Sequence, residues 1–273
     1  MGAQTTPPPG ISYRLGEAGA FVDSGCLDID PQREWAADAP MVSCLMVTRD
    51  RPNLAARAVE CFLAQTYPRR ELVIIDTGDG DRLRHAVEAI GLPPCTHRRV
   101  SPDGMSLGEL RNLAVQSAAG RYVCSWDDDD LSDPDRLTVQ MAAIEALGAD
   151  ACFLTREQMW WPARGLLAWS MPRIWESTMV CATSHAPRYA SVERGEDTPA
   201  AFRLWRSARV VMLDEPRLYT YVVHGSNTCG EKHFAAHFAA ATRTWAGAEY
   251  LARLAELADR VPVDTPVDPD GGT

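Results

Sequence analysis

Residues 41–76 read MVSCLMVTRDRPNLAARAVECFLAQTYPRRELVIID. The initial run, MVSCLMVT, is apolar and contains β-branched side chains, which favours a buried strand. The segment after Pro52 carries apolar residues at helical spacing, at Ala55, Val59 and Leu63, and the stretch ends in a second apolar run, ELVIID. The stretch therefore predicts strand, helix and strand in succession, which is the unit from which parallel sheets are built.

The same alternation continues to about Thr155. Residues 81–91 predict a helix closed by a glycine, and residues 106–120 predict another with Ser106 as its N-cap and Gly120 as its stop. A strand over YVCSWD and a helix over DRLTVQMAAIEALG follow. Such alternation indicates an α/β fold with three layers, in which helices cover both faces of a mostly parallel central sheet.

Polar residues follow three of the predicted strands, at the point where each strand ends. They are Thr48 to Asp50, Asp76 to Asp81 and Asp127 to Asp130. Open α/β sheets present the carboxyl ends of parallel strands at one edge and bind ligands there. We therefore expect these residues to share one site.

Four consecutive aspartates, Asp127 to Asp130, end the third of these strands in the sequence SWDDDDLSDPDRL. A run of like charges is commonly a solvated turn. Here the run follows an apolar strand and precedes a turn into a helix, where carboxylates that repel one another need a positive partner. Alternate carboxylates can converge on a hard divalent cation, which can bridge a diphosphate. We therefore predict a metal–phosphate role for the run.

The composition limits the classes of function. The formal net charge is -10 over 273 residues, and such an acidic surface disfavours nucleic acid as a partner. We expect no signal peptide and no integral membrane segment, because no long uncharged apolar run is found. The eight cysteines include no C-x-x-C pair, which favours buried reduced thiols. A cytoplasmic protein is expected, with peripheral association at a membrane left open.

Three segments together resemble a known family: VSCLMVTRDRPNLAARAVECFLAQTYPRRELVIIDTGDG, RNLAVQSAAGRYVCSWDDDDLSDPDRL and GEDTPAAFRL. Their order and spacing are similar to those of the family 2 glycosyltransferases, over about residues 41–233. The resemblance implies a GT-A-like, Rossmann-like α/β fold and a nucleoside-diphosphate sugar as donor. It further implies a divalent cation, Mn²⁺ or Mg²⁺, and an inverting, hexosyltransferase-like transfer to an acceptor that the sequence does not identify.

The resemblance also implies roles for individual residues. In the D-x-D element, Asp129 corresponds to the direct metal ligand and Asp127 to the contact with the ribose and the metal, with Asp128 as a supporting charge. His224, in the HG-x-N-T-like string HGSNT, is a further candidate for the metal or the diphosphate. The residues expected to bind the nucleotide are Thr48, Arg49, Asp76, Thr77, Arg111, Asp127 and Asp128.

Two positions depart from the family pattern on the side of the nucleoside. The string TRD stands where a T-Y-N-like string is common, and its Arg49 offers a guanidinium that can stack on a base. Thr77 stands where a second aspartate often accepts a hydrogen bond from uracil, and threonine can donate or accept. A UDP-sugar stays the favoured donor, with guanosine, cytidine and thymidine donors left open.

An inverting transfer needs a carboxylate that takes the proton of the attacking acceptor. In the string GEDT, Glu196 and Asp197 stand before a predicted helix, where an acidic pair is also common for structural reasons alone. By the family pattern Asp197 corresponds to the general base and Glu196 to a supporting residue. Trp160 and Trp161 have two interpretations, a stacking platform for an acceptor sugar or part of the core.

The chain is expected to have three parts. Residues 1–40 form a tail and a loose arm, because they begin with the proline-rich string MGAQTTPPPG. Residues 41–260 form the GT-A domain, with a nucleotide-sugar half over 41–155 and an acceptor-side half over 156–260, in which residues 231–260 predict one long or broken helix. Residues 261–273, rich in Pro, Gly and Asp, form a flexible tail.

Two other functions compete with glycosyl transfer. A nucleotidyltransferase also combines aspartates, a metal and an α/β sheet, but VTRDRPN lacks the glycines of a basic phosphate loop. A catalytically inactive module that binds a cation or a sugar would also keep the acidic run. The presence of both Asp129 and Asp197 argues against such a module.

Overall fold

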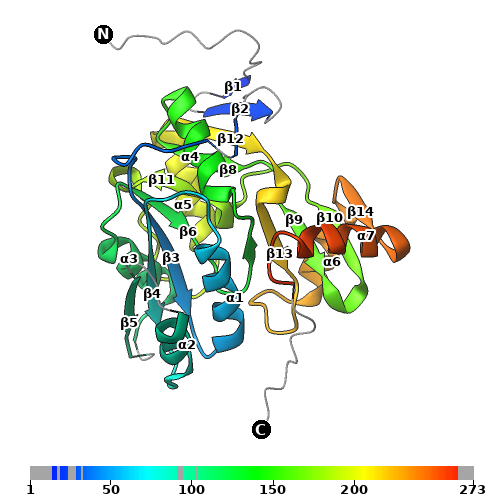
Figure 1. Ribbon diagram of the computed structural model, residues 1–273, viewed down its shortest axis with the longest axis horizontal. Helices are drawn as coiled ribbons and strands as arrows, with labels where there is room; N and C mark the ends of the chain where they lie inside the picture. Colours follow the sequence, from blue (N-terminus) through cyan, green and yellow to red (C-terminus); the bar gives the residue numbers. More distant parts are fainter. Residues whose placement is uncertain are drawn as a thin grey trace.

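The central sheet contains the strands that alternate with helices. The computed structural model describes residues 14–16, 19–23, 29–31, 33–90, 95–101 and 104–263, and in them nine strands form this sheet in the order β1-β2-β12-β8-β11-β6-β3-β4-β5 (Figure 1). Five of the neighbouring pairs are parallel and three antiparallel, so the sheet is mostly parallel, as predicted. Its strands are β1 (Arg14–Gly16), β2 (Gly19–Asp23), β3 (Val42–Thr48), β4 (Arg70–Asp76), β5 (Cys95–Arg99), β6 (Tyr122–Ser125), β8 (Ala151–Leu154), β11 (Val180–Ala182) and β12 (Val210–Asp214).

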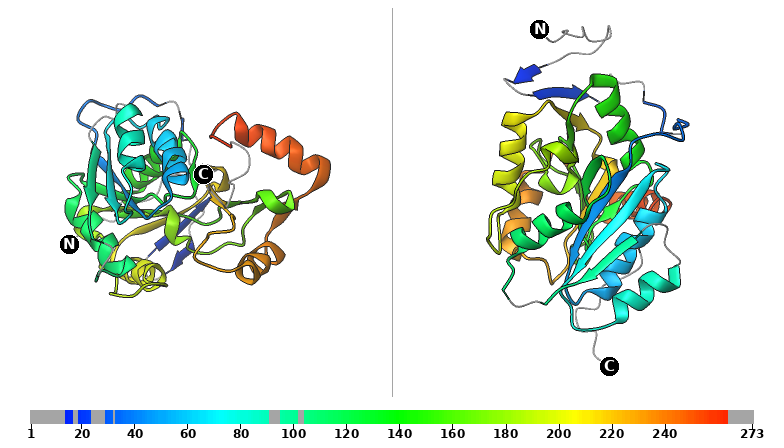
Figure 2. Two further views of the ribbon diagram at one scale, coloured as in Figure 1. Left: turned by 90° about the horizontal axis from the view of Figure 1, so that it is seen from below. Right: turned by 90° about the vertical axis from the view of Figure 1, so that its left-hand side faces the viewer.

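Helices cover both faces of this sheet, because alternate residues of a strand point to opposite sides. Cys44 and Met46 of β3 share a core cluster with α1, α2 and α4, whereas Leu45, between them, belongs to a cluster with α3 and α5. Figure 2 shows the sheet between these two sets of helices, which confirms the α/β/α layers. The helices are α1 (Pro52–Leu63), α2 (Arg82–Ile90), α3 (Leu107–Ser117), α4 (Arg136–Leu147), α5 (Asp197–Ser207), α6 (Glu231–Ala239) and α7 (Gly247–Ala258).

Local signals set the ends of α3 only in part. Ser106 caps the helix as predicted: its hydroxyl accepts the N–H of Glu109 at 3.4 Å, and its own N–H donates to the Glu109 carboxylate at 2.8 Å. The helix ends at Ser117, however, before the expected stop at Gly120. Gly120 instead permits a close approach of two segments, because a Cβ there would lie 2.6 Å from Ser43 Oγ.

A second sheet, of five strands in the described residues, follows the order β14-β10-β9-β13-β7 and lies to the right in Figure 1. Trp160 and Trp161 are 4% and 5% exposed, so they belong to the core and form no open platform. The expected helix over 231–260 is broken, because β14 separates α6 from α7. The strands of this sheet are β7 (Leu131–Ser132), β9 (Gln158–Trp161), β10 (Leu166–Trp169), β13 (Tyr219–Val222) and β14 (Arg243–Trp245).

Both ends of the described chain extend the fold beyond the expected domain. Residues 19–23, predicted to be part of a loose arm, form β2, which pairs in parallel with β12. At the other end Val261 is 5% exposed and belongs to the core, beyond the expected boundary at Arg260. The rest of the expected tails, residues 1–13 and 264–273, lies outside the described residues. Within the described ranges, no helix combines the length and apolar character needed to cross a bilayer.

Candidate active site

The ends of three adjacent strands bring the polar residues to one edge of the central sheet. Strands β4, β3 and β6 are parallel neighbours, and Thr48 and Asp76 lie opposite each other at their carboxyl ends. The Thr48 hydroxyl donates a 2.6 Å hydrogen bond to Asp128 Oδ2, which ties the end of β3 to the aspartate run. The three polar strand ends therefore meet at one rim.

Two of the four aspartates point into the protein. Asp128 and Asp130 are 5% and 4% exposed. Asp130 accepts hydrogen bonds from two groups of β13, the Tyr219 hydroxyl at 2.5 Å and the Val222 N–H at 2.8 Å. Burial, reinforced by the charge of Asp129, raises the pKa of Asp128 to about 7 and the pKa of Asp130 well above its ordinary value. These two carboxylates fix the aspartate loop between the two sheets.

The other two aspartates are more accessible, with 23% of the Asp127 side chain and 17% of the Asp129 side chain exposed. Asp129 Oδ2 accepts from Arg51 Nη1 at 2.9 Å and lies 3.1 Å from His224 Nε2. Burial alone would raise the pKa of Asp129, but His224 and Arg51 together lower it. For Asp127 burial prevails and raises the pKa, although Arg111 Nη2, 3.3 Å away, opposes the shift. The positive partners of the acidic run are thus arginines, and the His224 ring lies beside Asp129.

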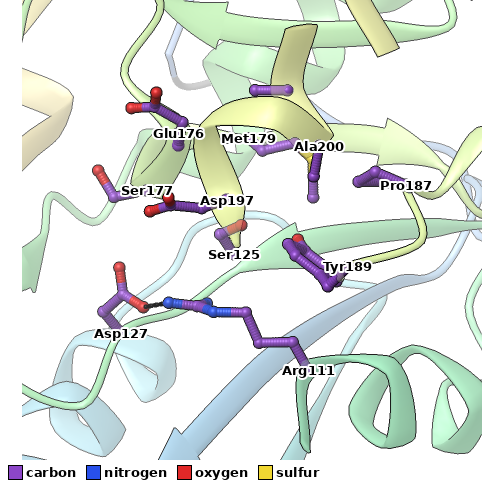
Figure 3. Close-up of a pocket in the computed structure, with 11 residues that line it drawn as sticks. Arg111, Ser125, Asp127, Glu176, Ser177, Met179, Pro187, Tyr189, Asp197 and Ala200 are labelled. Atoms are coloured by element: carbon purple, nitrogen blue, oxygen red, sulfur yellow. Dashed lines mark hydrogen bonds and ion pairs between the residues drawn. The ribbon is translucent and has the colours of Figure 1, made fainter. Parts of the chain in front are cut away.

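A small pocket lies beside Asp127 (Figure 3). Asp197, the first residue of α5, lines the same pocket from the opposite side. Arg111 lies between the two regions, since its Nε donates to Glu196 Oε1 at 2.9 Å and its Nη2 to Asp127 Oδ1. Glu196 is 2% exposed, and burial raises its pKa. The remaining lining residues are Ser125, Glu176, Ser177, Met179, Pro187, Tyr189, Ala200 and Ala201.

The residues expected to contact the nucleoside lie on the β3–β4 side of the rim. The Arg49 side chain is 66% exposed and can meet a ligand directly. Asp76 is buried, with Oδ2 3.1 Å from His97 Nε2. Thr77 is also buried, and its hydroxyl faces the backbone carbonyl at the end of β3 at 3.4 Å. The structure therefore leaves Arg49 open, whereas Asp76 and Thr77 already have partners within the protein.

Asp129 and His224 are the expected metal ligands that the structure brings into contact. Among the described residues, no group of three or more His, Cys, Asp or Glu side chains is arranged to hold a metal ion. The His224 ring is nevertheless held in place, because its Nδ1 lies 2.9 Å from Ser226 Oγ while Nε2 faces Asp129. A carboxylate oxygen beside an imidazole nitrogen suits Mn²⁺, and phosphate oxygens and water can complete such a shell. The donor chemistry of this pair fits a divalent cation.

Three residues that contact the predicted site residues were not themselves predicted: Arg51, Tyr219 and Tyr189. Arg51 directly follows the string TRD, so the strand-end argument that located Thr48 could have located it as well. Tyr219 reaches the aspartates only because β13 pairs with β7. The Tyr189 ring lies 5.9 Å from the Arg111 guanidinium and comes from the loop before α5. No periodic pattern marks either tyrosine.

The sequence matches known families and relatives over less than half of its length. Residues 43–160 match the family model described as Glycosyl transferase family 2. Over 112 residues, 40% of the chain, the sequence is 34% identical to WcaA of Escherichia coli (strain K12), a glycosyl transferase assigned to colanic acid biosynthesis. Over 111 residues it is 31% identical to the succinoglycan biosynthesis protein ExoO of Rhizobium meliloti (strain 1021). The matched stretches are 39% and 31% of these relatives, so the chain spans well under half of their length.

Solved structures resemble the chain over more of its length. S. aureus TarS 1–349 in complex with UDP-GlcNAc superposes with a TM-score of 0.59 at 16% identity, covering 81% of this chain and 72% of that one. The mannosyltransferase PcManGT from Pyrobaculum calidifontis in complex with GDP-Man and Mn²⁺ gives 0.57 at 15% identity, covering 89% and 68%. At these identities the likeness shows the fold alone, a GT-A-like, Rossmann-like α/β fold.

Proposed function

We propose that this chain transfers a sugar from a nucleoside-diphosphate sugar to a hydroxyl group of an acceptor, because residues 43–160 match the model of glycosyl transferase family 2. The observation that carries the proposal is the shared pocket of Asp127 and Asp197, with Arg111 bridging Asp127 to Glu196. We propose residues 41–155 as the half that holds the donor and residues 156–260 as the half that faces the acceptor.

The proposed reaction is a single displacement that inverts the anomeric carbon. The acceptor oxygen bonds to this carbon while the bond from the carbon to the β-phosphate oxygen breaks, and the acceptor proton passes to Asp197. Asp197 suits this role because it is only partly buried and lines the pocket. Glu196 is buried in an ion pair with Arg111, so it orients that arginine and is closed to an acceptor.

We propose that Asp129 and His224 hold a divalent cation, with Asp127 beside them. When bound, such a cation would supply positive charge that stabilises the diphosphate leaving group. The protein holds the site in position through Asp130, which is fixed by β13, and through Asp128, which is fixed by Thr48.

We propose a uridine nucleotide as the donor, with a guanosine nucleotide as the other donor to test, because the two structural neighbours are complexes with UDP-GlcNAc and GDP-Man. The exposed guanidinium of Arg49 supports a base stacked at the end of β3. Asp76 and Thr77 lie next to this position, but their side chains already contact His97 and the Thr48 carbonyl, so the proposed contact with the base rests on Arg49.

A panel of sugar nucleotides tests the proposal. The full chain is incubated with each donor and Mn²⁺ or Mg²⁺, and the released nucleotide is identified by mass. Release of a nucleoside diphosphate without pyrophosphate is expected. Pyrophosphate would instead indicate a nucleotidyltransferase. Binding of a donor without any turnover, with water or with simple sugars as acceptors, would indicate a binding module.

A further inference from the structure

Arg51 lies in the middle of the acidic cluster, although the proposed reaction gives it no part. It is the residue before α1, and its guanidinium contacts two separate segments. Nη1 lies 2.9 Å from Asp129 Oδ2 and 3.4 Å from Asp128 Oδ1, while Nη2 donates at 3.0 Å to the carbonyl oxygen of Ser226. The side chain is 28% exposed, so this contact borders solvent.

The contact of Arg51 with Asp129 uses the carboxylate oxygen that also faces His224. Asp129 Oδ2 receives Arg51 at 2.9 Å and has His224 Nε2 at 3.1 Å, and Asp129 and His224 are the residues proposed to hold the cation. A divalent cation and a guanidinium on one carboxylate oxygen would repel each other strongly at such short range. A cation that binds Asp129 Oδ2 must therefore replace Arg51 there.

The second arginine of the site is held more firmly. Arg111 lies between two carboxylates, with Nε on Glu196 at 2.9 Å and Nη2 on Asp127 at 3.3 Å, and 19% of its side chain is exposed. Moving it would leave the buried Glu196 carboxylate without its partner, which is costly. Arg51, by contrast, borders solvent, and the Asp128 carboxylate that it contacts keeps a hydrogen bond from Thr48. Of the two arginines, Arg51 is thus the one that can move away from its carboxylate partner.

We propose that Arg51 is a built-in counter-ion of the cation site, which it exchanges for a divalent cation. The guanidinium neutralises Asp129 until a cation takes the oxygen, and it then remains at the rim as a positive charge for the donor diphosphate. The inference rests on the proposed function of the site, because it takes from that proposal the residues that hold the cation. It concerns another residue, however, and it can be measured without donor or acceptor.

The test is a titration of the full-length protein with Mn²⁺ alone, followed by the electron paramagnetic resonance signal of free Mn²⁺. We expect Arg51→Gln and Arg51→Ala to bind Mn²⁺ about tenfold more tightly than wild type, because the competing ion pair is lost. Arg51→Lys, which keeps the charge, should stay near wild type. The matched control is Arg209→Ala, which changes the net charge equally at an exposed arginine outside the site, where the ion pair is with Asp150. It should shift the affinity by less than about twofold.

The direction of the shift separates the possible explanations. If Arg51 only positions Asp129, its removal weakens Mn²⁺ binding, and unchanged or weaker binding by folded Arg51→Gln overturns the inference while leaving the proposed function intact. If wild type and all variants bind no Mn²⁺, the metal part of the proposed function falls together with the inference. Thermal melting establishes that each variant is folded, and Arg51→Gln is used where Arg51→Ala does not fold.

Discussion

The site is divided between two halves of the chain that are built differently. Residues 41–155 supply side chains mainly from the ends of three adjacent parallel strands in one sheet, together with Arg111 from α3. Residues 156–260 supply them from a helix start, a short strand and a turn. The halves meet where β7, which directly follows the aspartate run, pairs with β13. The first half contributes Thr48, Arg51, Asp76, Arg111 and Asp127 to Asp130, and the second Glu196, Asp197, Tyr219 and His224.

The difference indicates a division of labour. Charge is concentrated in the first half, where buried aspartates repel one another and are held by arginines, which suits a diphosphate and its cation. The second half places one accessible carboxylate, Asp197, at the open side of the pocket. If this division holds, substitutions in the first half should impair binding, and Asp197 substitutions should impair turnover alone.

The largest effect is expected for Asp197→Asn. Loss of a general base typically lowers the rate by about 10²–10⁴-fold. Since Asp197 makes no part of the proposed cation or nucleotide contacts, the donor dissociation constant should stay within about threefold of wild type. The measurement pairs donor binding by calorimetry with single-turnover transfer. Glu193→Gln, an exposed acid-to-amide change in the same loop, is the control. Transfer by Asp197→Asn at the wild-type rate would mean that another residue is the base, and it would contradict the proposed split between donor binding in the first half and catalysis in the second.

The opposite pattern is expected for Asp129→Asn. An amide is a weaker ligand than a carboxylate, so Mn²⁺-dependent donor affinity should fall by about 10–100-fold. The same calorimetry, with and without Mn²⁺, shows whether the loss is confined to the cation-dependent part. Asp38→Asn, an exposed aspartate in the loop before β3, serves as the control for net charge. Unchanged affinity in Asp129→Asn would exclude this carboxylate from the cation site.

The two halves also differ in how much of them the sequence predicted. In the first half, long apolar runs such as MVSCLMVT gave the strands, and the strand ends then located Thr48, Asp76 and the aspartates. Among the strands not predicted there, β5 reads CTHRR and lies at the sheet edge, where an apolar run is not required. Arg51 was missed for a different reason: its place after a strand end could be predicted from the sequence, but its contacts with Asp129 and Ser226 could not.

In the second half, most strands have only three to five residues, which leaves little pattern for periodicity. The strand β14 has the sequence RTW and lies between two helical segments, so residues 231–260 predicted one long or broken helix. Asp197 and His224 were located by resemblance to a family, because nothing in their spacing alone separates them from an ordinary helix start or turn. Tyr219 depends on the pairing of β13 with the two-residue strand β7, which no local signal encodes.

A smaller effect is expected where the halves join. Tyr219→Phe removes the hydroxyl 2.5 Å from Asp130 Oδ2 and 3.3 Å from Asp127 Oδ2, but keeps the ring that packs on Arg136. A buried carboxyl group that loses a partner costs about 1–3 kcal/mol of stability, and donor affinity should fall by about tenfold as the aspartate loop loosens. Tyr221→Phe, the same change on the same strand, is the matched control. Equal effects of both substitutions would mean that the hydroxyl of Tyr219 does not couple the two halves.

The smallest effect expected is a pH dependence of stability that belongs to the first half. The pKa of Asp128 is about 7 in the folded protein, raised by burial and by Asp129 from an ordinary value of 3.8. A carboxyl group with a raised pKa binds its proton more tightly when folded, so its stabilising contribution is full below about pH 4 and is lost as the pH rises to about 7. The amide of Asp128→Asn stays neutral at every pH, so this variant does not show the loss of stability.

We therefore expect the melting temperature of Asp128→Asn, relative to wild type, to rise by a few degrees between pH 6 and pH 8, about what 1 kcal/mol provides in a chain of this size. A constant offset between the two proteins would reflect the altered hydrogen bonds to Thr48 and Arg51, and only the change with pH reports the titration. Asp38→Asn supplies the exposed comparison, for which the difference from wild type should be flat. A flat difference for Asp128→Asn as well would mean that this carboxylate is already ionised at pH 6, with Arg51 and Thr48 outweighing its burial.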